Sequence, residues 1–497
     1  MLRVLTVLAA LTSVLAEDVV VTTRLGQVRG SRVRTRPSTY VDSFLSLPYA
    51  KPPVGALRLM PTQPAEPWQG VLDATRYGPA CPQLADFDPM PTSEDCLSLS
   101  IFTPGHSAPG RGLPVMMYVH GGGFRTGSGA LFNGTELAKR GVVVVAINYR
   151  LDILGFLSTL DDSSPGNYGL LDMIQALKWI KANIASFRGN PGEITLFGGS
   201  AGSLSISHLR ISPLAKGLFN KVIMESGFAT CKWARKLPTD TPSPLTSAKR
   251  VATRVGCPVD SGTAALVACI KSKPVDILLN ASAAFLEGPA SSFIPVVETG
   301  FGVLPKNPED LIREGAGSDI PSIRGSSRDE DAIDAAYENR PSLQLSDAVR
   351  VSGELQQNGF RTPVCLPVRL PVPQLTLSFL DSRECFPSNI DSPVTGVPHG
   401  AEAPFVAGEP FNGLRNWTDT DKRVSATVMD MLSNFAKFGI SSARDPTPPL
   451  FTSVKWFLYN SVTQLYLTID SKPTLNSHLY QRRMDLVKSL YDQYGHY

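Results

Sequence analysis

A serine between two glycines is the residue of this 497-residue chain best suited to chemistry. Residues 194–203 read ITLFGGSAGS, an apolar run followed by Gly198-x-Ser200-x-Gly202 and then by a helical pattern. A serine at such a tight strand-to-helix turn is held in a strained conformation, so that its hydroxyl is exposed beside helix N–H groups that can face an oxyanion. The alternative interpretation is an ordinary glycine-rich turn. The motif alone therefore indicates a candidate nucleophile that needs support from other residues.

A glycine triplet earlier in the chain supplies part of that support. The apolar segment 115–119 is followed directly by residues 120–124, which read HGGGF. The N–H groups of such a triplet are unobstructed, and in esterases and lipases of the His-Gly-Gly-Gly type they form an oxyanion hole. By itself the triplet could be a turn or an anion-binding loop. Together with the serine motif, it predicts an acyl-transfer site for esters.

Hydrophobic periodicity indicates the elements that must position these motifs. Strand-like runs at 115–119, 142–147, 194–197 and 221–224 alternate with helical patterns, of which 170–187 is an amphipathic helix. This alternation predicts an α/β fold with a large, mostly parallel central sheet and helices on both faces. Near the end of the chain, 456–460 and 464–469 flank a short turn and are predicted to be a strand pair.

Composition excludes some classes of partner. A net charge of +3, with no basic run that includes interleaved aromatic residues, does not favour nucleic acid. Neither a Cys-x-x-Cys motif nor a cluster of histidines favours a metal, and we expect no cofactor. Composition says no more about partners; the motifs around Ser200 predict a small-molecule ester substrate, and the sequence does not determine the oligomeric state.

The first residues predict entry into the secretory pathway. Residues 1–16 have a charged start, an apolar stretch and small residues at a cut after Ala16, as in a signal peptide; an uncleaved anchor is the alternative. No later segment is apolar and long enough to span a membrane, and the C-terminus has no retention signal. Glycosylation sequons occur at Asn133, Asn280 and Asn416. We therefore expect a secreted protein.

The seven cysteines fit an oxidising compartment. Close spacing predicts two short-loop disulfides, which join Cys81 to Cys96 and Cys257 to Cys269. Three cysteines then remain, so at least one thiol is expected to stay unpaired. Of these three, Cys231 is interpreted as a small buried hydrophobic residue.

Several long motifs, in order, resemble the type B carboxylesterases, the family that includes cholinesterases, bile-salt-activated lipases and the non-catalytic neuroligins. The motifs are LPYAKPPVG at 47–55, SEDCL at 93–97, HGGGF at 120–124, NYR at 148–150 with GFL at 155–157, GNYGLLD at 166–172, the serine motif, and NFAK at 434–437. The resemblance implies an α/β-hydrolase fold for one domain that spans residues 17–497. It also implies the chain order serine, acid, histidine for the catalytic triad.

The resemblance assigns the other members of the site. His399, in GVPHGAE at 396–402, is similar to the family's His-Gly-x-acid loop and is expected to be the general base. Glu330, in IPSIRGSSRDED at 320–331, stands at the family's acid position, although Asp331 replaces the usual glycine; the alternative is a solvated loop tip. The resemblance also assigns backbone donors to the oxyanion at Gly122, Gly123 and Ala201, and an acyl pocket at Trp233 and Phe293. Ser226 is assigned a role in supporting the acid and the histidine; the alternative is that this serine is purely structural.

Two departures from the family bear on the substrate. The loop from Cys81 to Cys96 has no tryptophan, and Gly199 stands where cholinesterases have a glutamate, so choline specificity is not expected. Residues 288–292, GPASS, stand where cholinesterases narrow the acyl pocket, which predicts room for larger acyl groups.

The third departure concerns length. Glu330 and His399 are only 69 positions apart (399 minus 330), so the domain is predicted to be shortened between residues 331 and 398. The expected function is a secreted serine hydrolase of carboxylic esters. The alternatives are a non-catalytic, neuroligin-like adhesion or ligand-binding protein and a lipase for lipid esters.

Overall fold

The computed structural model describes twelve ranges of the chain. They are residues 17–36, 39–84, 90–105, 112–231, 234–285, 293–327, 374–379, 399–400, 402–412, 417–439, 465–469 and 474–477.

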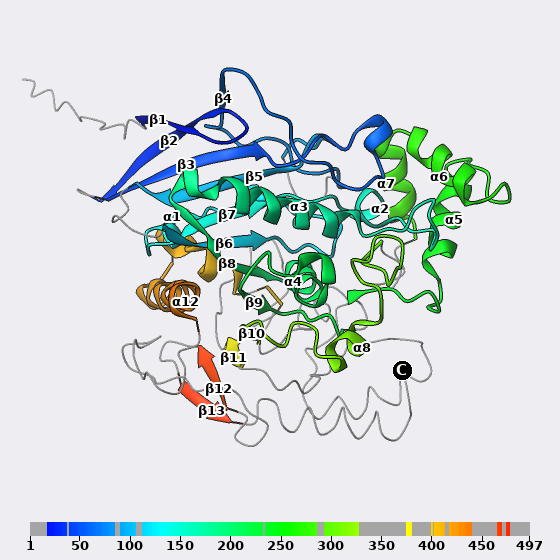
Figure 1. Cartoon of the computed structure of the whole chain (residues 1–497). Coiled ribbons are helices and arrows are strands. Elements are labelled where there is room, and N and C mark those ends of the chain that lie inside the picture. The colour runs from blue at the N-terminus through cyan, green and yellow to red at the C-terminus, as the bar shows by residue number, and fades with distance from the viewer. Residues whose placement is uncertain are drawn as a thin grey trace, which may run out of the picture.

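The described residues form strands and helices that alternate through the middle of the chain (Figure 1). The strands are β1 (Glu17–Thr22), β2 (Gln27–Arg36), β3 (Thr39–Pro48), β4 (Val71–Asp73), β5 (Ser98–Pro104), β6 (Leu113–Val119), β7 (Val143–Ile147), β8 (Gly189–Gly199), β9 (Lys221–Glu225), β10 (Ser322–Ser327), β11 (Gln374–Phe379), β12 (Leu465–Ile469) and β13 (Thr474–Ser477). The helices are α1 (Thr135–Ala138), α2 (Asp152–Phe156), α3 (Tyr168–Asn183), α4 (Ala201–Ile211), α5 (Pro244–Arg254), α6 (Thr263–Ser272), α7 (Val275–Ala283), α8 (Pro308–Arg313), α11 (Ala403–Ala407) and α12 (Asp419–Phe438).

All of these strands belong to one sheet. Its order is β1-β2-β3-β5-β7-β6-β8-β9-β10-β11-β12-β13, and β4 pairs with β2. Along this order, each pair of neighbours from β7 to β12 is parallel. The pairs β1–β2, β2–β3, β3–β5 and β5–β7 are antiparallel, and so is the final pair, β12–β13. The predicted α/β fold with a mostly parallel centre is confirmed, and antiparallel strands extend it at both edges.

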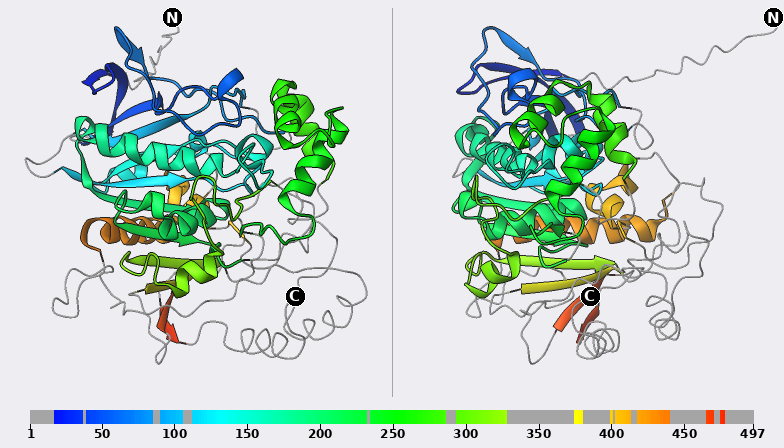
Figure 2. Two further views of the ribbon diagram at one scale, coloured as in Figure 1. Left: turned by 45° about the vertical axis from the view of Figure 1, so that its right-hand side comes forward. Right: turned by 90° about the vertical axis from the view of Figure 1, so that its right-hand side faces the viewer.

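Helices cover both faces of the central strands. Alternate residues of β7 show the two layers: Val143 and Val145 pack in the core with residues of α3 and α4, while Val144 and Ala146 pack with residues of α1 and α12. All five residues of β7 are buried, which explains why the strand is a continuous apolar run. Figures 1 and 2 show α5, α6 and α7 gathered beyond one end of the strands.

Most of the predicted elements are present, with small shifts. The four predicted strands correspond to β6, β7, β8 and β9, and the predicted helix 170–187 is α3 followed by a short 3₁₀ turn from Ile184 to Phe187. The predicted strand at 464–469 is β12, which pairs with β11 and with β13. Its predicted partner, 456–460, lies outside the described residues.

Both predicted disulfides are present, one between Cys81 and Cys96 and the other between Cys257 and Cys269. Cys231 is fully buried as expected, but it too is disulfide-bonded, and its partner lies outside the described ranges. The interpretation of Cys231 as a simple hydrophobic residue is therefore wrong. The predicted signal peptide also lies outside the described residues, among which no helix combines the length and apolar character needed to cross a membrane.

Candidate active site

Ser200 lies at the junction of β8 and α4 in a strained conformation. Its φ of 54° and ψ of −126° place a residue with a side chain in a region that mainly glycine adopts. Two backbone bonds hold it there: its N–H donates to the Glu225 carbonyl (2.9 Å), and its carbonyl accepts the Leu204 N–H (2.9 Å). The bond to Glu225 joins the turn to β9, and the bond to Leu204 begins α4. Ser200 therefore lies at the carboxyl edge of the sheet.

The two flanking glycines are required by close approach to β6. A Cβ at Gly198 would lie 2.2 Å from the Val119 carbonyl oxygen, and a Cβ at Gly202 would lie 2.0 Å from the same oxygen. Both distances are far below any real contact of a Cβ atom. The Gly-x-Ser-x-Gly spacing is therefore a packing requirement of this junction as well as a motif.

The glycine triplet 121–123 packs against the serine turn. A Cβ at Gly121 would lie 3.1 Å from the Ser200 Cβ, and Gly122 and Gly123 have φ values of 108° and 61°. The Gly122 carbonyl accepts the N–H groups of Arg125 and Thr126 at 3.0 Å, which closes the loop. Within the described part of the chain, the N–H groups of Gly122, Gly123 and Ala201 donate to no protein acceptor. Three backbone donors beside Ser200 are thus available to a ligand.

His120, which begins this loop, is held as a neutral ring. Burial lowers its pKa to about 4, and its Nδ1 lies 2.8 Å from the Gly121 carbonyl, to which a protonated Nδ1 donates. The ring stacks on Tyr149 with a centroid separation of 4.3 Å, and the Tyr149 hydroxyl donates to the His120 carbonyl (2.8 Å). His120 therefore fixes the loop and is too enclosed to act as a base at neutral pH.

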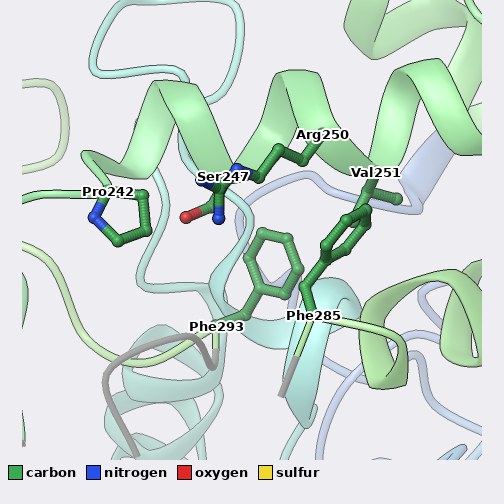
Figure 3. Close-up of a pocket in the computed structure, with 6 residues that line it drawn as sticks. All are labelled: Pro242, Ser247, Arg250, Val251, Phe285 and Phe293. Atoms are coloured by element: carbon green, nitrogen blue, oxygen red, sulfur yellow. The ribbon is translucent and has the colours of Figure 1, made fainter. Parts of the chain in front are cut away.

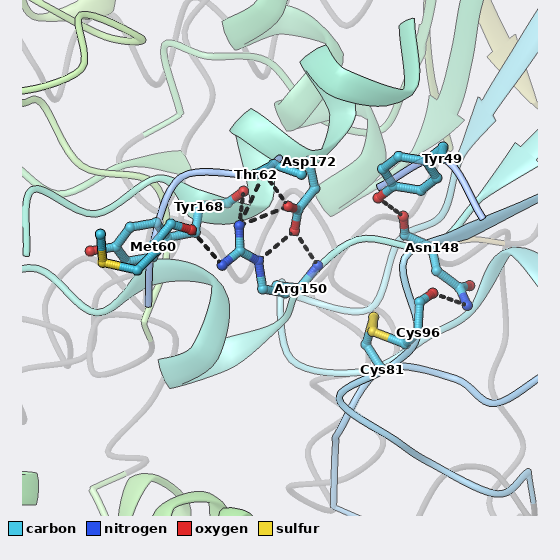
Figure 4. A network of polar contacts seen from close by, with 9 residues as sticks. All are labelled: Tyr49, Met60, Thr62, Cys81, Cys96, Asn148, Arg150, Tyr168 and Asp172. Atoms are coloured by element: carbon cyan, nitrogen blue, oxygen red, sulfur yellow. Dashed lines mark hydrogen bonds and ion pairs between the residues drawn. A yellow bond between two sulfur atoms is a disulfide. The ribbon is translucent and has the colours of Figure 1, made fainter. Parts of the chain in front are cut away.

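A buried ion pair anchors the segment that contains Tyr149. Arg150 and Asp172 are 3% and 0% exposed, and they meet through two side-chain contacts of 2.8 and 2.9 Å (Figure 4). The Arg150 guanidinium also donates to the Met60 carbonyl and the Thr62 hydroxyl, which leaves this buried cation well satisfied.

A second set of bonds joins the same segment to the first disulfide. The side-chain amide of Asn148 donates to the Cys96 carbonyl (3.1 Å), and the backbone carbonyl of Asn148 accepts a hydrogen bond from the Tyr49 hydroxyl (2.7 Å) (Figure 4). Four separate sequence motifs, at 47–55, 93–97, 148–150 and 166–172, therefore meet in one network. Their role in the described structure is to support the glycine loop.

His399 is partly buried, and a short turn connects it to a well-anchored residue, Glu402. Glu402 is 2% exposed and accepts hydrogen bonds from the hydroxyls of Ser226 (3.5 Å) and Ser327 (3.1 Å). Its Oε1 lies 3.5 Å from the position of a Cβ at Gly199. Three residues of chain reach at most about 11 Å, so Glu402 keeps His399 in the neighbourhood of the serine turn.

Ser226 occupies a second strained turn, at the end of β9. Its φ is 55°, and its N–H donates to the Gly325 carbonyl of β10 (2.9 Å). The preceding residue, Glu225, is 4% exposed, and its Oε1 is enclosed without a hydrogen-bond partner. Burial, and then the charge of Glu402, raises the pKa of Glu225 to about 8. Glu225 therefore favours its protonated form at neutral pH.

Several predicted residues lie outside the described ranges. Glu330 follows the end of β10 by three residues and is not described, and the same holds for Trp233 and Asn416. What the structure does describe is the strand that leads to Glu330: β10 pairs with β9 in parallel, and β9 pairs with β8 in parallel. The ends of β8, β9 and β10 therefore lie side by side.

Phe293 is buried and lines a small pocket below α5 (Figure 3). The other lining residues are Pro242, Ser247, Arg250, Val251 and Phe285. The lining includes neither Ser200 nor His399, so the place of Phe293 in an acyl pocket stays a prediction. The predicted glycosylation residues Asn133 and Asn280 are both exposed, before α1 and on α7 respectively.

The sequence assigned no role to Glu225 or Glu402, although Glu402 ends the quoted motif at 396–402. The available signal was position: Glu225 directly precedes Ser226, and Glu402 follows His399 by three residues. Neither position reveals burial. The described ranges contain no group of three or more histidine, cysteine or acidic side chains that could bind a metal ion.

Comparison with known proteins agrees with this geometry. The model of the "Carboxylesterase family" matches residues 17–360 and 375–487. Carboxylesterase 1D of Mus musculus is 43% identical over 336 residues, which is 63% of this chain and 58% of that relative. Cocaine esterase of Oryctolagus cuniculus is 33% identical over 527 residues, with 93% of this chain and 94% of the relative covered, and pyrethroid hydrolase Ces2e of Rattus norvegicus is 41% identical over 323 residues, with 62% and 54% covered. With its α/β-hydrolase sheet and its serine junction, the chain belongs to the carboxylesterase family and is a carboxylic ester hydrolase.

Proposed function

We propose that this chain is a secreted serine hydrolase that cleaves carboxylic esters through an acyl-enzyme on Ser200, with His399 as general base and Glu330 as the acid that orients it. The observation that supports this most strongly is the strained Ser200 beside three N–H groups without protein acceptors. The turn of His399, tied to the same junction by Glu402, adds the expected base.

The first half of the reaction acylates the serine. His399 removes the hydroxyl proton as the Ser200 oxygen attacks the ester carbonyl, and a tetrahedral intermediate with a negatively charged oxygen forms. The N–H groups of Gly122, Gly123 and Ala201 bind that oxygen, and one such donor typically lowers the barrier by about 3 kcal/mol. Protonated His399 then gives its proton to the departing alcohol, which leaves the acyl-enzyme.

The second half releases the acid. His399 removes a proton from water, the resulting nucleophile attacks the acyl carbonyl, and the Ser200 oxygen leaves with a proton from the histidine. Glu330 holds the imidazole in the required tautomer and stabilises its charged form without becoming protonated. Ser226 supports this arrangement through its hydrogen bond to Glu402.

The substrate is a carboxylic ester that is not a choline ester and that has an acyl group larger than acetyl. The loop from Cys81 to Cys96 has no tryptophan to bind a quaternary ammonium, and Gly199 adds no carboxylate beside the nucleophile. Relatives named for pyrethroid, acylcarnitine and fatty acyl-CoA hydrolysis support a preference for substantial acyl groups.

Secretion is supported by covalent structure. Two disulfides join described residues, and a third includes Cys231, as expected for a protein that folds in an oxidising compartment. The exposure of Asn133 and Asn280 is compatible with glycosylation there.

A fluorophosphonate probe tests the proposal directly. The secreted full-length protein is incubated with the probe, and the modified residue is located by peptide mass spectrometry. We expect one modification, on Ser200, that is lost in Ser200→Ala and strongly slowed in His399→Gln. Ser205→Ala, which changes a buried serine of the same helix, is the matched control and should be labelled like the natural protein. A folded protein without labelling would instead identify a non-catalytic binding protein.

A panel of p-nitrophenyl esters tests the substrate class. Butyrate and longer acyl groups should give higher kcat/KM than acetate, and butyrylthiocholine should show no advantage over an uncharged butyryl thioester. A strict preference for acetyl would contradict the proposed acyl pocket. Activity that rises only when the ester forms aggregates would identify a lipase.

A further inference from the structure

The loop that carries Gly122 and Gly123 continues into an arginine. Arg125 donates its backbone N–H to the Gly122 carbonyl (3.0 Å), and a Cβ at Gly121 would lie 3.1 Å from the Ser200 Cβ. With standard bond lengths, these two contacts keep the Arg125 backbone nitrogen within about 14 Å of the Ser200 Cβ. Arg125 therefore belongs to the surroundings of the nucleophile, although no step of ester cleavage uses its charge.

The residue before Arg125 anchors this turn to the core. Phe124 is fully buried, and its ring meets the ring of Phe156 edge-on at a centroid separation of 5.2 Å. The Phe124 carbonyl accepts the N–H of Asp152, the first residue of α2, at 2.7 Å. Asp152 has a φ of 47°, which is uncommon for a residue with a side chain. The side chain of Arg125 thus projects from a well-anchored turn.

The guanidinium of Arg125 is partly enclosed, and its outer end is accessible. The residue is partly buried, and its Nε is enclosed without a hydrogen-bond partner. Its two Nη atoms form no hydrogen bond and no ion pair with the described residues, but unlike Nε they are not enclosed. Two N–H-bearing atoms of a permanent cation are therefore available to a group that approaches from solvent.

Asp152 provides negative charge near Arg125, but this acid is buried. It is 3% exposed, and its Oδ1 accepts the Ser282 hydroxyl of α7 at 2.7 Å. Burial raises the pKa of Asp152 to about 6, while the bond from Ser282 and then the charge of Arg125 act in the opposite direction. Asp152 is therefore mostly ionised at neutral pH and attracts Arg125 without forming an ion pair with it. Because the carboxylate is enclosed and the Nη atoms are not, an approaching ligand meets the cation.

Other arginines of the chain show the partner that a guanidinium takes. The Nε of Arg58 lies 2.6 Å from the Glu94 carboxylate, and an Nη of Arg150 lies 2.8 Å from the Asp172 carboxylate. A planar guanidinium matches a carboxylate because two N–H groups can donate to its two oxygens. The chemistry of the accessible Nη atoms of Arg125 therefore fits a carboxylate that a ligand supplies.

We propose that Arg125 is a specificity-determining residue that binds a carboxylate on the ester substrate. This inference rests on the proposed function, since it names the substrate class of the same site. The chain then prefers an ester with one negative charge to an uncharged or cationic ester of similar shape. Either the alcohol or the acyl part of such an ester can carry the charge. The same cation repels a quaternary ammonium, which is a second reason to expect no choline preference.

Two pairs of esters test this preference in the full-length protein. For the alcohol part, 4-carboxyphenyl butyrate is compared with the neutral 4-carbamoylphenyl butyrate. For the acyl part, monophenyl adipate is compared with the neutral phenyl hexanoate. We expect the natural protein to have the higher kcat/KM for the anionic member of at least one pair, and the pair that responds identifies the part of the substrate that Arg125 binds. Raising the ionic strength should reduce this preference.

Arg125→Gln removes the charge and keeps a polar side chain. For the anionic ester, kcat/KM should fall about tenfold or more, mainly through KM, because a hydrogen bond to a charged group is lost. The neutral esters should change little, and kcat/KM for butyrylthiocholine should rise. A general loss of structure cannot produce these opposite changes. Arg125→Lys keeps the charge and should retain most of the preference.

Arg24→Gln is the matched control, because it also removes one positive charge. Arg24 is exposed, and its backbone N–H donates to Asn183 at the end of α3 (3.2 Å), near the start of β8 and not near the end that leads to Ser200. This variant should keep the preference of the natural protein. An equal loss in Arg24→Gln and Arg125→Gln would show that only net charge matters and would overturn the proposal.

Binding gives a readout that does not depend on catalysis. In Ser200→Ala, calorimetric titration with 4-carboxyphenyl butyrate and with monophenyl adipate should show tighter binding than with the neutral esters, and adding Arg125→Gln should remove the difference. Failure of fluorophosphonate to label Ser200 would refute the proposed function, whereas these titrations would still decide the role of Arg125. The proposal is wrong if neither anionic ester is preferred by the natural protein, or if the preference survives in Arg125→Gln.

Discussion

Replacing Gly198 by alanine should damage the protein, although it adds only one methyl group. The new Cβ would lie 2.2 Å from the Val119 carbonyl oxygen of β6, whereas real Cβ atoms do not approach below 3.0 Å. The strand must therefore move by about 0.8 Å, the difference between these two distances. Because the obstacle is backbone and not the end of a flexible side chain, β6 and β8 must separate locally.

The size of the effect follows from this displacement. Overpacking a dense interior typically costs about 1–3 kcal/mol, and one weakened ladder hydrogen bond adds about 1 kcal/mol. We therefore expect a loss of about 2–4 kcal/mol, which for a domain of this size corresponds to a fall in Tm of about 2–4 °C. Labelling of Ser200 by a fluorophosphonate should also slow, since the same displacement moves the serine turn.

The neighbouring glycine provides the control. A Cβ at Gly199 would meet the nearest atom, the Glu402 Oε1, at 3.5 Å, which is ordinary contact. Gly199→Ala should therefore fold with a nearly unchanged Tm when both variants are heated at one scan rate. If Gly198→Ala and Gly199→Ala unfold at the same temperature, the inference that close approach to β6 dictates the motif is refuted.

Three further predictions concern pH, the buried ion pair and a disulfide. Because the folded protein raises the pKa of Glu225 from 4.5 to about 8, stability should fall as pH rises through this window, and Glu225→Gln should flatten the dependence of Tm on pH between 5 and 8. Asp172→Asn keeps the shape but leaves Arg150 buried without its counterion, so urea denaturation should show a loss of about 3–5 kcal/mol, and a loss below 1 kcal/mol would argue against a buried pair. Changing both Cys257 and Cys269 to serine opens a loop with a sequence separation of 12 and should lower stability by about 3 kcal/mol in the same assay. Because this disulfide is then absent, a reducing agent should cause no further loss through it.

Local features of the site could be predicted from the sequence because their causes are local. The serine junction is recognised from glycines two residues before and two after the serine, a short motif, although the steric reason for these glycines is close approach to the separate strand β6. The apolar run of β7 reflects burial on both faces, which composition reveals directly. The short-loop disulfides also followed from spacing, because cysteines that are close in sequence meet readily.

Contacts between distant segments were beyond the sequence. The pairing of Ser226 with Glu402 joins residues 176 positions apart, and that of Ser327 with Glu402 joins residues 75 apart. Nothing in the neighbourhood of either partner specifies the other. The same applies to the motif at 166–172, whose Asp172 holds Arg150 beneath the glycine loop rather than touching the reaction centre.

The sequence by itself determined the family, the order of the central strands along the chain and the candidate nucleophile, since periodicity and short motifs are properties of neighbouring residues. Only the tertiary structure decided that Glu225 holds a proton and that Cys231 is bonded. The physical reason is the same in each case. Desolvation and Coulomb energy depend on which distant groups surround a side chain, and the packing of β8, β9 and β10 against α4 and α11 determines those surroundings.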